Sequence, residues 1–355
     1  MTAEQQNILE VTDFSVSYGY GDTAVRAVSD VNFTLGTSHV LGVAGESGSG
    51  KSTLVYGLTR LLRAPGVISG GDVIFNIPTE NGVKPFDMLA ASEEDMRNVR
   101  WSHISIVLQS ALSALNPLRR IGREFDEVLR THDKGLDKAQ RAARAAELLD
   151  MVGLDADRLD RFPHELSGGQ RQRVMIAMAL ALKPELVIMD EPTTALDVVT
   201  QREIVSELYE LRKKLGFAMI FITHDLSLLV ELADELMVMY AGHIVERAVA
   251  TDLYNTPRHP YTLGLMNSFP PLHGERKVLT GIPGSPPDLK ALPTGCTFSP
   301  RCPYAMDICR QQVPPLSTFD ETGRLVACWL HEPSVGAAVP VELSKKNVST
   351  KGGVA

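Results

Sequence analysis

The most specific chemical pattern in the sequence is a glycine-rich loop, GESGSGKST, at residues 45–53. Glycines let the backbone N–H groups of such a loop turn toward phosphate oxygens, and the start of the following helix adds partial positive charge. Lys51 is expected to reach the β- and γ-phosphates of a nucleotide, and the Ser52 hydroxyl is expected to bind Mg²⁺. The loop residues predicted to bind nucleotide are Gly45, Glu46, Ser47, Gly48, Ser49, Gly50, Lys51, Ser52 and Thr53.

Two carboxylates, Asp190 and Glu191, follow the apolar stretch LVIM at residues 186–189. A buried strand of this kind places them at the carboxyl edge of a parallel sheet, where such folds bind ligands. We expect Asp190 to hold Mg²⁺ and Glu191 to polarise the water that attacks the phosphate. A helix-capping acid pair is the alternative interpretation.

Three single side chains are weaker candidates. His224 follows an apolar stretch and is expected to touch the γ-phosphate and orient the water, although a histidine at a strand end is usually structural. Gln109 closes HISIVLQ and offers a carbonyl oxygen to Mg²⁺. Tyr18 is a candidate for stacking on adenine, with Tyr20 as its competitor and a plain strand aromatic as the alternative.

A second candidate phosphate cradle begins a predicted helix at Ser167, Gly168, Gly169 and Gln170, within ELSGGQRQRV. Free N–H groups at a helix start form an anion site. Both cradles can serve one nucleotide if the chain folds back on itself. The alternative is a head-to-tail pair, in which each Ser-Gly-Gly caps the nucleotide held by the other chain and Asp197 lies near the seam.

The pattern of elements predicts an α/β fold with a largely parallel sheet. Apolar strand signals alternate with helical ones through about residue 250, and unbroken apolar runs suit strands buried on both faces. ELMVMYAGHIVE predicts a late hairpin that turns at Ala241-Gly242. Residues of about 110–182 are expected to form a helical insertion, with Asp137 as the N-cap of one helix and a second helix from near Ser167.

Composition limits the class of protein. The chain has 355 residues, which suits two domains, and its formal net charge of −8 argues against a role in gripping nucleic acid. The longest apolar run has nine residues, Val174–Leu182, against roughly 18 for a spanning helix. The N-terminus has no signal-peptide pattern. We therefore expect a cytosolic protein whose link to any membrane runs through a partner.

Together, these motifs resemble the nucleotide-binding domain of ATP-binding-cassette (ABC) proteins over about residues 8–250. The matching pieces, in order, are GESGSGKST, Gln109, LSGGQ, LVIMDEP, ALD and His224. The resemblance implies a RecA-like core, an N-terminal antiparallel β part and a helical subdomain at about 110–182. It also implies ATP and Mg²⁺ as cofactors, with the second cradle serving the ATP of a partner subunit.

Other stretches of the chain indicate which branch of the ABC family it resembles. SALNPLRRIG, RFPHELSGG, NTPRHPYT and GCTFSPRCPYAMDICRQQVPPL resemble ATPase subunits of the peptide and nickel importer branch. Such a subunit implies a second, related ABC ATPase, two transmembrane permease subunits and an extracytoplasmic solute-binding protein, at the cytoplasmic face of the membrane. Residues 251–335 are expected to form a loop-rich C-terminal extension and residues 336–355 a disordered tail. Peptide is the default solute of this branch, alongside nickel and oligosaccharides.

The four cysteines all lie in the last 60 residues, as Cys296, Cys302, Cys309 and Cys328. Their spacing lacks the C-x₂-C pair typical of zinc sites, and thiolate-only ligation also suits an iron–sulfur cluster. Some members of the importer branch hold a [4Fe–4S] cluster here, so the resemblance implies one. Zinc or unligated thiols remain alternatives, and His331 is a further candidate ligand.

Two other functions are alternatives to ATP-driven import. One is a soluble ABC ATPase that acts on DNA or ribosomes. The chain lacks the long coiled-coil insertion of the DNA-repair members and carries one cassette rather than two. The other is a redox sensor built on the cysteines. The intact ATP machinery argues against sensing as the main role, although sensing stays open as a side-function.

Overall fold

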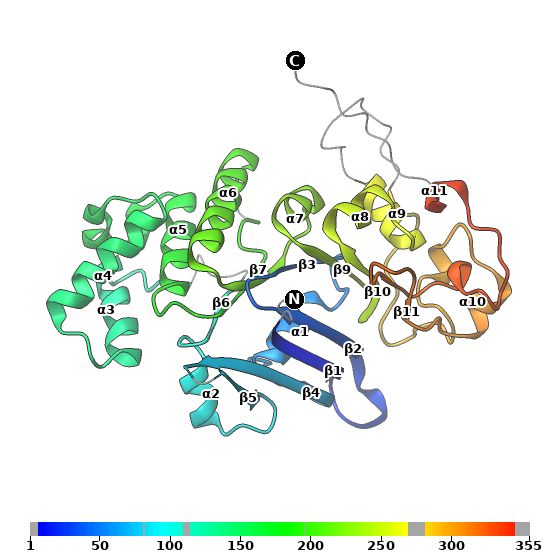
Figure 1. The fold of residues 1–355 in the computed structure, drawn as a ribbon, viewed down its shortest axis with the longest axis horizontal. Coiled ribbons are helices and arrows are strands. Elements are labelled where there is room, and N and C mark those ends of the chain that lie inside the picture. Colours follow the sequence, from blue (N-terminus) through cyan, green and yellow to red (C-terminus); the bar gives the residue numbers. More distant parts are fainter. Residues whose placement is uncertain (1–5, 81, 109–113, 195, 269–280, 345–355) are drawn as a thin grey trace, which may run out of the picture. The chain divides into compact units, whose positions relative to one another are not determined.

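The structure is a computed structural model of the whole chain, and it describes residues 6–80, 82–108, 114–194, 196–268 and 281–344 (Figure 1). The chain forms two compact units. Unit 1 comprises Met1–Val11, Phe33–Val40 and Asp72–Thr223, and unit 2 comprises Thr12–Asn32, Leu41–Gly71 and His224–Ala355.

A four-stranded sheet in the N-terminal part has the strand order β2-β1-β4-β5. Its strands are β1 (Asn7–Tyr18), β2 (Val25–Gly36), β4 (Gly66–Thr79) and β5 (Gly82–Asp87). The last two pair antiparallel, from Ile74 opposite Asp87 to Thr79 opposite Gly82. Along β1, Phe14, Ser15, Val16 and Ser17 are all buried, so both faces of this part of the strand are covered. The predicted antiparallel β part is thereby confirmed.

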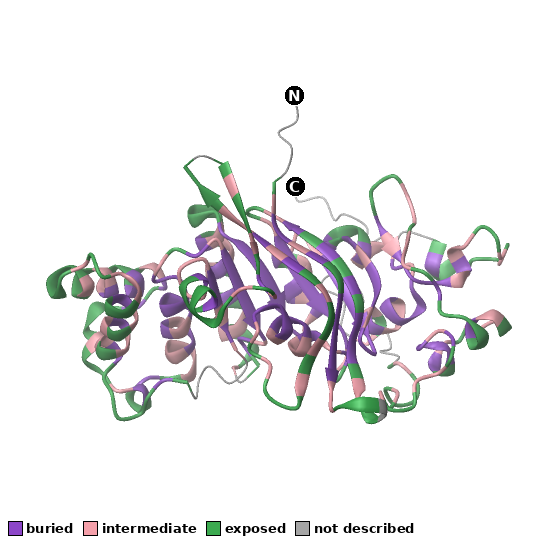
Figure 2. Cartoon of the chain, turned by 90° about the horizontal axis from the view of Figure 1, so that it is seen from below, coloured by how far each residue is buried: buried purple, intermediate pink, exposed green. Residues whose placement is uncertain are grey.

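Unit 1 contains three parallel strands built from short, unbroken apolar runs. They are β6 (Ile104–Val107), β7 (Leu186–Asp190) and β8 (Ala218–Ile222), and β7 pairs with both of the others. Every residue of β7 and β8 is buried. In Figure 2 buried residues fill much of the strands in the middle of the view, beside strands that are partly exposed. Burial on both faces explains why these segments lack the alternation of a surface strand.

The helical segment of unit 1 lies between β6 and β7 in the chain. It holds α3 (Ile121–His132), α4 (Lys138–Met151), η3 (Ala156–Asp160), η4 (Pro163–Glu165) and α5 (Gly168–Ala179), and the three α-helices pack together (Figure 1). Asp137 caps α4 as predicted, because its side chain accepts the N–H of Gln140 while the Gln140 side chain accepts the N–H of Asp137. Unit 1 also contains α2 (Glu93–Val99) and α6 (Val198–Leu215).

Unit 2 carries a second set of sheet strands, in the order β3-β9-β10-β12-β11. β3 (Val40–Ala44) runs parallel to β9 (Glu235–Tyr240), and β9 forms the predicted hairpin with β10 (His243–Val249). The turn residues Ala241 and Gly242 both have positive φ angles, of 47° and 84°. Two short strands from the C-terminal extension, β12 (Leu325–Val326) and β11 (Ser317–Thr318), continue the antiparallel pairing from β10.

Unit 2 also contains the remaining helices. They are η1 (Gly21–Thr23), α1 (Lys51–Leu58), α7 (Leu226–Leu232), α8 (Ala250–Asn255), α9 (Pro260–Asn267), η5 (Ser299–Arg301), α10 (Asp307–Gln311), η6 (Trp329–His331) and α11 (Val341–Ser344). Leu343 of α11 is fully buried, inside the stretch for which we expected a disordered tail. Residues 345–355 lie outside the described ranges. The predicted domain boundaries stay predictions.

A buried carboxylate joins the C-terminal extension to the sheet of unit 2. Glu246 of β10 is 0% exposed and accepts the backbone N–H groups of Arg258 and His259, each at 2.9 Å. Arg324 lies 3.6 Å away as its ionic partner. Burial raises the pKa of Glu246, and the Arg324 charge opposes that rise. The extension therefore supplies the groups that make a buried acid tolerable in β10.

Within the described ranges, no helix combines the length and the apolar character needed to cross a membrane.

The four cysteines line one cavity of about 10 Å³ in unit 2, but our prediction of an iron–sulfur cluster there is wrong. Among the described residues, no group of three or more His, Cys, Asp or Glu side chains is arranged to hold a metal ion, which also removes zinc. The cavity is about the size of one water molecule. Burial raises the pKa of Cys296, of Cys328 and of Cys302, the last to about 11. The four side chains are free thiols.

Buried thiols of this kind are expected to react slowly with iodoacetamide in the folded chain at pH 8. At a pKa of about 11, Cys302 is about 0.1% thiolate at that pH, against roughly a quarter for an ordinary thiol. Its alkylation rate should keep rising between pH 9 and 11, and peptide mass mapping after timed exposure measures it. The chain unfolded in urea is the control, with a rate that levels off above about pH 9. Equal folded and unfolded rates for Cys302 at pH 8 would contradict the expectation.

Candidate nucleotide-binding site

The phosphate loop in unit 2 has a backbone path that only glycine permits at two positions. Gly45 and Gly50 have φ angles of 151° and 102°. A Cβ at Gly45 would lie 2.4 Å from the carbonyl oxygen of Met239, and one at Gly50 would lie 2.5 Å from that of Ala27. Gly50 is also the N-cap of α1, so no side chain caps the first N–H groups of that helix. A helix start whose N-cap residue has no side chain is a position where the partial positive charge of the helix favours an anion such as phosphate.

The Lys51 side chain lies inside the loop. It is 6% exposed, and its Nζ donates to the carbonyl oxygens of Gly45 and Glu46 at 2.8 and 2.9 Å. A third contact, to Ser49 Oγ, measures 3.5 Å. The loop thus holds an ammonium group among backbone oxygens at the start of α1. This charge and the glycine-lined backbone fit a nucleotide phosphate chain.

Of the two tyrosines proposed to stack on adenine, Tyr18 lies beside the loop. Its hydroxyl is 3.4 Å from Oγ1 of Thr53, and the ring is half-buried. Tyr20 is 70% exposed. This placement favours Tyr18, and stacking on adenine stays a prediction.

The acid pair belongs to unit 1, where β7 ends. Asp190 is fully buried. Glu191 has a φ of 48°, its backbone N–H donates to the carbonyl of Ile222 at 2.9 Å, and Oε2 accepts the Thr194 hydroxyl at 2.9 Å. The helix-capping alternative fails, because the N-cap of the next helix, α6, is Asp197. The Glu191 carboxylate is instead oriented by a hydroxyl three residues further along the chain.

The Ser-Gly-Gly motif begins α5 as predicted, and its cap is more elaborate than we expected. Ser167 Oγ accepts the N–H of Gln170 at 3.2 Å, and the Gln170 side chain accepts the N–H of Ser167 at 3.0 Å. A Cβ at Gly169 would lie 2.8 Å from Cγ2 of Thr200. The glycine therefore serves close packing against the start of α6, as well as any role at a phosphate.

Asp197 lies at the adjoining start of α6. It accepts the N–H groups of Val199 and Thr200, and the Thr200 hydroxyl, at 3.1, 3.0 and 2.8 Å. The hydrogen bond from the Thr200 N–H is the main cause of its lowered pKa. Unit 1 thus brings the Ser-Gly-Gly motif and Asp197 together.

The other residues predicted to act on the nucleotide lie in different parts of the chain. His224 is exposed, two residues after β8 ends, and is the first residue of that part of unit 2. Lys51 also belongs to unit 2, whereas Glu191 belongs to unit 1. Gln109 lies outside the described residues.

Two residues that our sequence analysis did not single out contact the phosphate loop. Tyr261 and Arg301, both from the C-terminal part of unit 2, bond to Glu46. They lie 215 and 255 residues away in the sequence. The only signals around them are the proline-rich stretches RHPY and SPRCPY, which have no periodicity.

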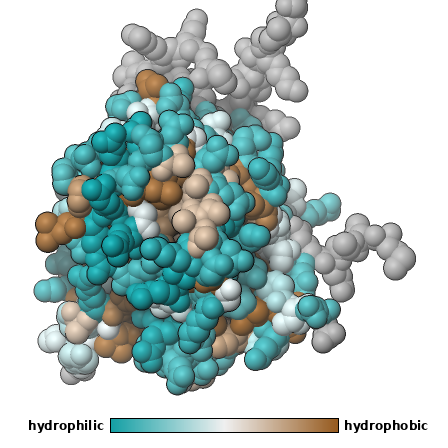
Figure 3. All heavy atoms as spheres, turned by 90° about the vertical axis from the view of Figure 1, so that its left-hand side faces the viewer, coloured by the Kyte–Doolittle hydropathy of each residue, from teal (hydrophilic) through white to brown (hydrophobic). Residues whose placement is uncertain are grey.

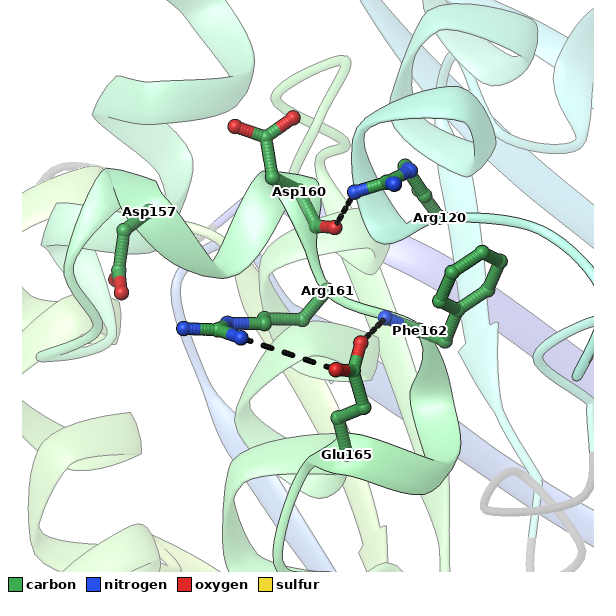
Figure 4. A pocket seen from close by; sticks show the side chains of 6 residues that line it. All are labelled: Arg120, Asp157, Asp160, Arg161, Phe162 and Glu165. Atoms are coloured by element: carbon green, nitrogen blue, oxygen red, sulfur yellow. Dashed lines mark hydrogen bonds and ion pairs between the residues drawn. The ribbon is translucent and has the colours of Figure 1, made fainter.

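The helical segment of unit 1 carries a charged pocket of about 390 Å³ just before the Ser-Gly-Gly motif (Figure 4). Its lining residues are Arg120, Asp157, Asp160, Arg161, Phe162 and Glu165. Glu165 accepts the N–H of Phe162 at 2.7 Å and faces Arg161 at 3.7 Å, and Arg120 lies over the Phe162 ring. The face of this segment in Figure 3 is largely hydrophilic, with scattered apolar residues.

Comparisons with known proteins agree with this geometry. Residues 28–194 match the family described as ABC transporter, and residues 245–309 match the C-terminal region of oligopeptide/dipeptide transporters. The oligopeptide transport ATP-binding protein OppD of Salmonella typhimurium is 44% identical over 91% of this chain and 93% of its own. The dipeptide transport ATP-binding protein DppD of Escherichia coli is 39% identical over 94% and 99%.

Solved structures of ABC transporter cassettes are also similar to this chain. The dimeric structure of MJ0796, a bacterial ABC transporter cassette, aligns with a TM-score of 0.59 at 25% identity and covers 68% of this chain and 98% of its own. A dimeric post-hydrolysis state of the same cassette, bound to ADP and Pi, gives 0.58 over the same shares. The motifs, the fold and the full-length relatives agree, and the chain belongs to the ABC transporter ATPases, among the ATP-binding proteins of the oligopeptide/dipeptide family.

Proposed function

We propose that this ATPase drives uptake of oligopeptides or dipeptides as one half of a head-to-tail pair of ATPase subunits at the cytoplasmic face of a membrane. The observation that carries the proposal is the similarity to oligopeptide and dipeptide transport ATP-binding proteins along more than nine-tenths of the chain. That similarity includes the C-terminal region, which a general ABC cassette does not need. The partner ATPase is a related chain or a second copy.

In this proposal the motif residues have separate tasks at the nucleotide. Lys51 and the loop N–H groups hold the phosphates, and Ser52, Gln109 and Asp190 provide the oxygens for Mg²⁺. Bound Mg²⁺ supplies charge neutralisation at the phosphates. Glu191 takes a proton from the attacking water, and the Thr194 hydroxyl holds its carboxylate for that task. His224 orients the same water.

The signature helix α5 is proposed to act on the nucleotide of the partner subunit. Ser167 and Gln170 cap each other, so the backbone of Gly168 and Gly169 is fixed at the helix start. Their N–H groups then face the partner's phosphates. Asp197 is the N-cap of α6, whose Thr200 lies close to Gly169, and it belongs to the same interface in our proposal.

The further partners are two transmembrane permease subunits, with an extracytoplasmic solute-binding protein reached through them. The charged pocket at Arg120 and Glu165 suits a polar cytoplasmic segment of a permease, because its arginines and carboxylates offer hydrogen bonds of both kinds. No nucleic-acid partner is proposed, in keeping with the net charge of −8.

Replacing Glu191 with Gln is expected to leave ATP binding within about twofold of the wild type and to lower kcat by about 10²–10⁴-fold, because the amide cannot accept the proton. Phosphate release by the assembled transporter and equilibrium ATP binding measure the two effects. Glu210→Gln on α6 is the matched control, since Glu210 is 71% exposed. Turnover by Glu191→Gln at near wild-type rate would refute the assigned role.

Replacing Ser167 with Ala tests the head-to-tail arrangement. Loss of this N-cap is expected to destabilise the chain by about 1 kcal/mol and to weaken ATP-dependent association of the ATPase pair, measured by sedimentation. Ser92→Ala is the matched control, because Ser92 caps α2 through the N–H of Asp95 in the same way. It should cost similar stability and leave association intact. Equal association by both variants would count against the arrangement.

A further inference from the structure

The carboxylate of Glu46, inside the phosphate loop, is held by an arginine from the C-terminal extension. Arg301 donates from its two terminal nitrogens to the two oxygens of Glu46, at 2.7 and 3.0 Å. This is a bidentate pair, the strongest form of a charge-assisted contact. The side chain of Arg301 is 6% exposed and that of Glu46 is 25% exposed, so water screens the pair only in part.

A second contact fixes the backbone of the same residue. The N–H of Glu46 donates to the hydroxyl of Tyr261 at 2.8 Å. Tyr261 belongs to α9 and is fully buried. Its ring packs against those of Tyr240 and Phe298, with centroids 4.6 and 5.4 Å away. The hydroxyl therefore has little freedom to move away from the loop.

Arg301 is itself fixed by its surroundings. Its Nε donates to the carbonyl of Pro283 at 2.8 Å, and a terminal nitrogen lies 3.4 Å from the carbonyl of Gly284. The guanidinium also lies over the ring of Tyr240, 5.9 Å from its centroid. The bond to Glu46 is the largest cause of the raised pKa of Arg301, which keeps the guanidinium charged.

A negative side chain in a loop that binds polyphosphate needs compensation. Glu46 lies close to the expected phosphate position, because its backbone carbonyl accepts a hydrogen bond from Lys51 Nζ at 2.9 Å. Without a counter-charge, its carboxylate would therefore repel the incoming phosphates. Arg301 neutralises this carboxylate and turns it toward the C-terminal extension. Tyr261 sets the first turn of the loop through the Glu46 N–H.

We propose that Arg301 and Tyr261 are positioning residues for ATP: the C-terminal extension neutralises Glu46 and presets the phosphate loop. The proposal rests on ATP binding at this loop, as in the function proposed above. It predicts that ATP binding weakens when Arg301 alone is lost and recovers when Glu46 is neutralised as well. Loss of Arg301 alone leaves a free negative charge beside the phosphates, whereas loss of both charges removes the repulsion.

The test compares Arg301→Met, Glu46→Gln and the double variant in the full-length chain within its transporter. For Arg301→Met, the KM for Mg-ATP should rise about tenfold while kcat stays within about twofold. The double variant should return the KM to within about threefold of the wild type. Tyr261→Phe should raise the KM about threefold, because only the hydroxyl is lost. Arg310→Met is the matched control, an arginine of the same extension that is 66% exposed, and it should change nothing.

Thermal unfolding of each variant separates positioning from stability. If Arg301→Met unfolds at assay temperature, Arg301→Lys replaces it. Lysine keeps the positive charge but cannot make the bidentate contact, so the KM is expected to rise about threefold. A wild-type KM for Arg301→Met, or for Arg301→Lys where that variant replaces it, would overturn the proposal, and so would a double variant no better than Arg301→Met. Failure of the wild-type chain itself to bind Mg-ATP saturably would instead overturn the proposed function.

Discussion

A buried ammonium group surrounded by backbone carbonyls is the interaction on which the phosphate loop depends. Lys51 Nζ reaches the oxygens of Gly45 and Glu46 only because the loop curls back over the start of α1. That curl requires the positive φ of Gly45, where a side chain would meet the carbonyl of Met239 in β9. The parallel pairing of β3 with β9 places this carbonyl there. The loop is therefore shaped by the sheet behind it as well as by its own glycines.

The C-terminal extension supplies arginines to two glutamates of the cassette. Arg301 pairs with Glu46 in the phosphate loop, and Arg324 pairs with the fully buried Glu246 in β10. At Glu246, two backbone N–H groups supplement the charge pair, whereas at Glu46 the Tyr261 hydroxyl accepts the residue's own backbone N–H. A buried carboxylate is stable only with such partners. The extension is thus joined to the cassette by charge compensation and by the β10–β12 pairing, rather than by apolar packing alone.

Local patterns in the sequence predicted those parts of the fold whose cause is local. The apolar runs of β7 and β8, the cap at Asp137 and the glycine loop were read correctly, because periodicity, capping and turn chemistry involve neighbouring residues. The contacts of Tyr261 and Arg301 with Glu46 span more than 200 residues and leave no local pattern. The cysteine spacing was misleading for a related reason. Spacing along the chain does not fix how side chains are arranged in space, and the described residues hold no group of three or more His, Cys, Asp or Glu side chains arranged for a metal ion.

The long reach from Glu46 to Arg301 also has a consequence for biosynthesis. A ribosome makes the phosphate loop early, yet 255 more residues must be added before its arginine exists. Domains generally fold from the N-terminus during synthesis. A nascent cassette that has emerged without the extension carries an uncompensated carboxylate in its nucleotide loop. Full affinity for ATP then arises only near the end of translation. Unfinished chains therefore bind ATP more weakly than finished chains do.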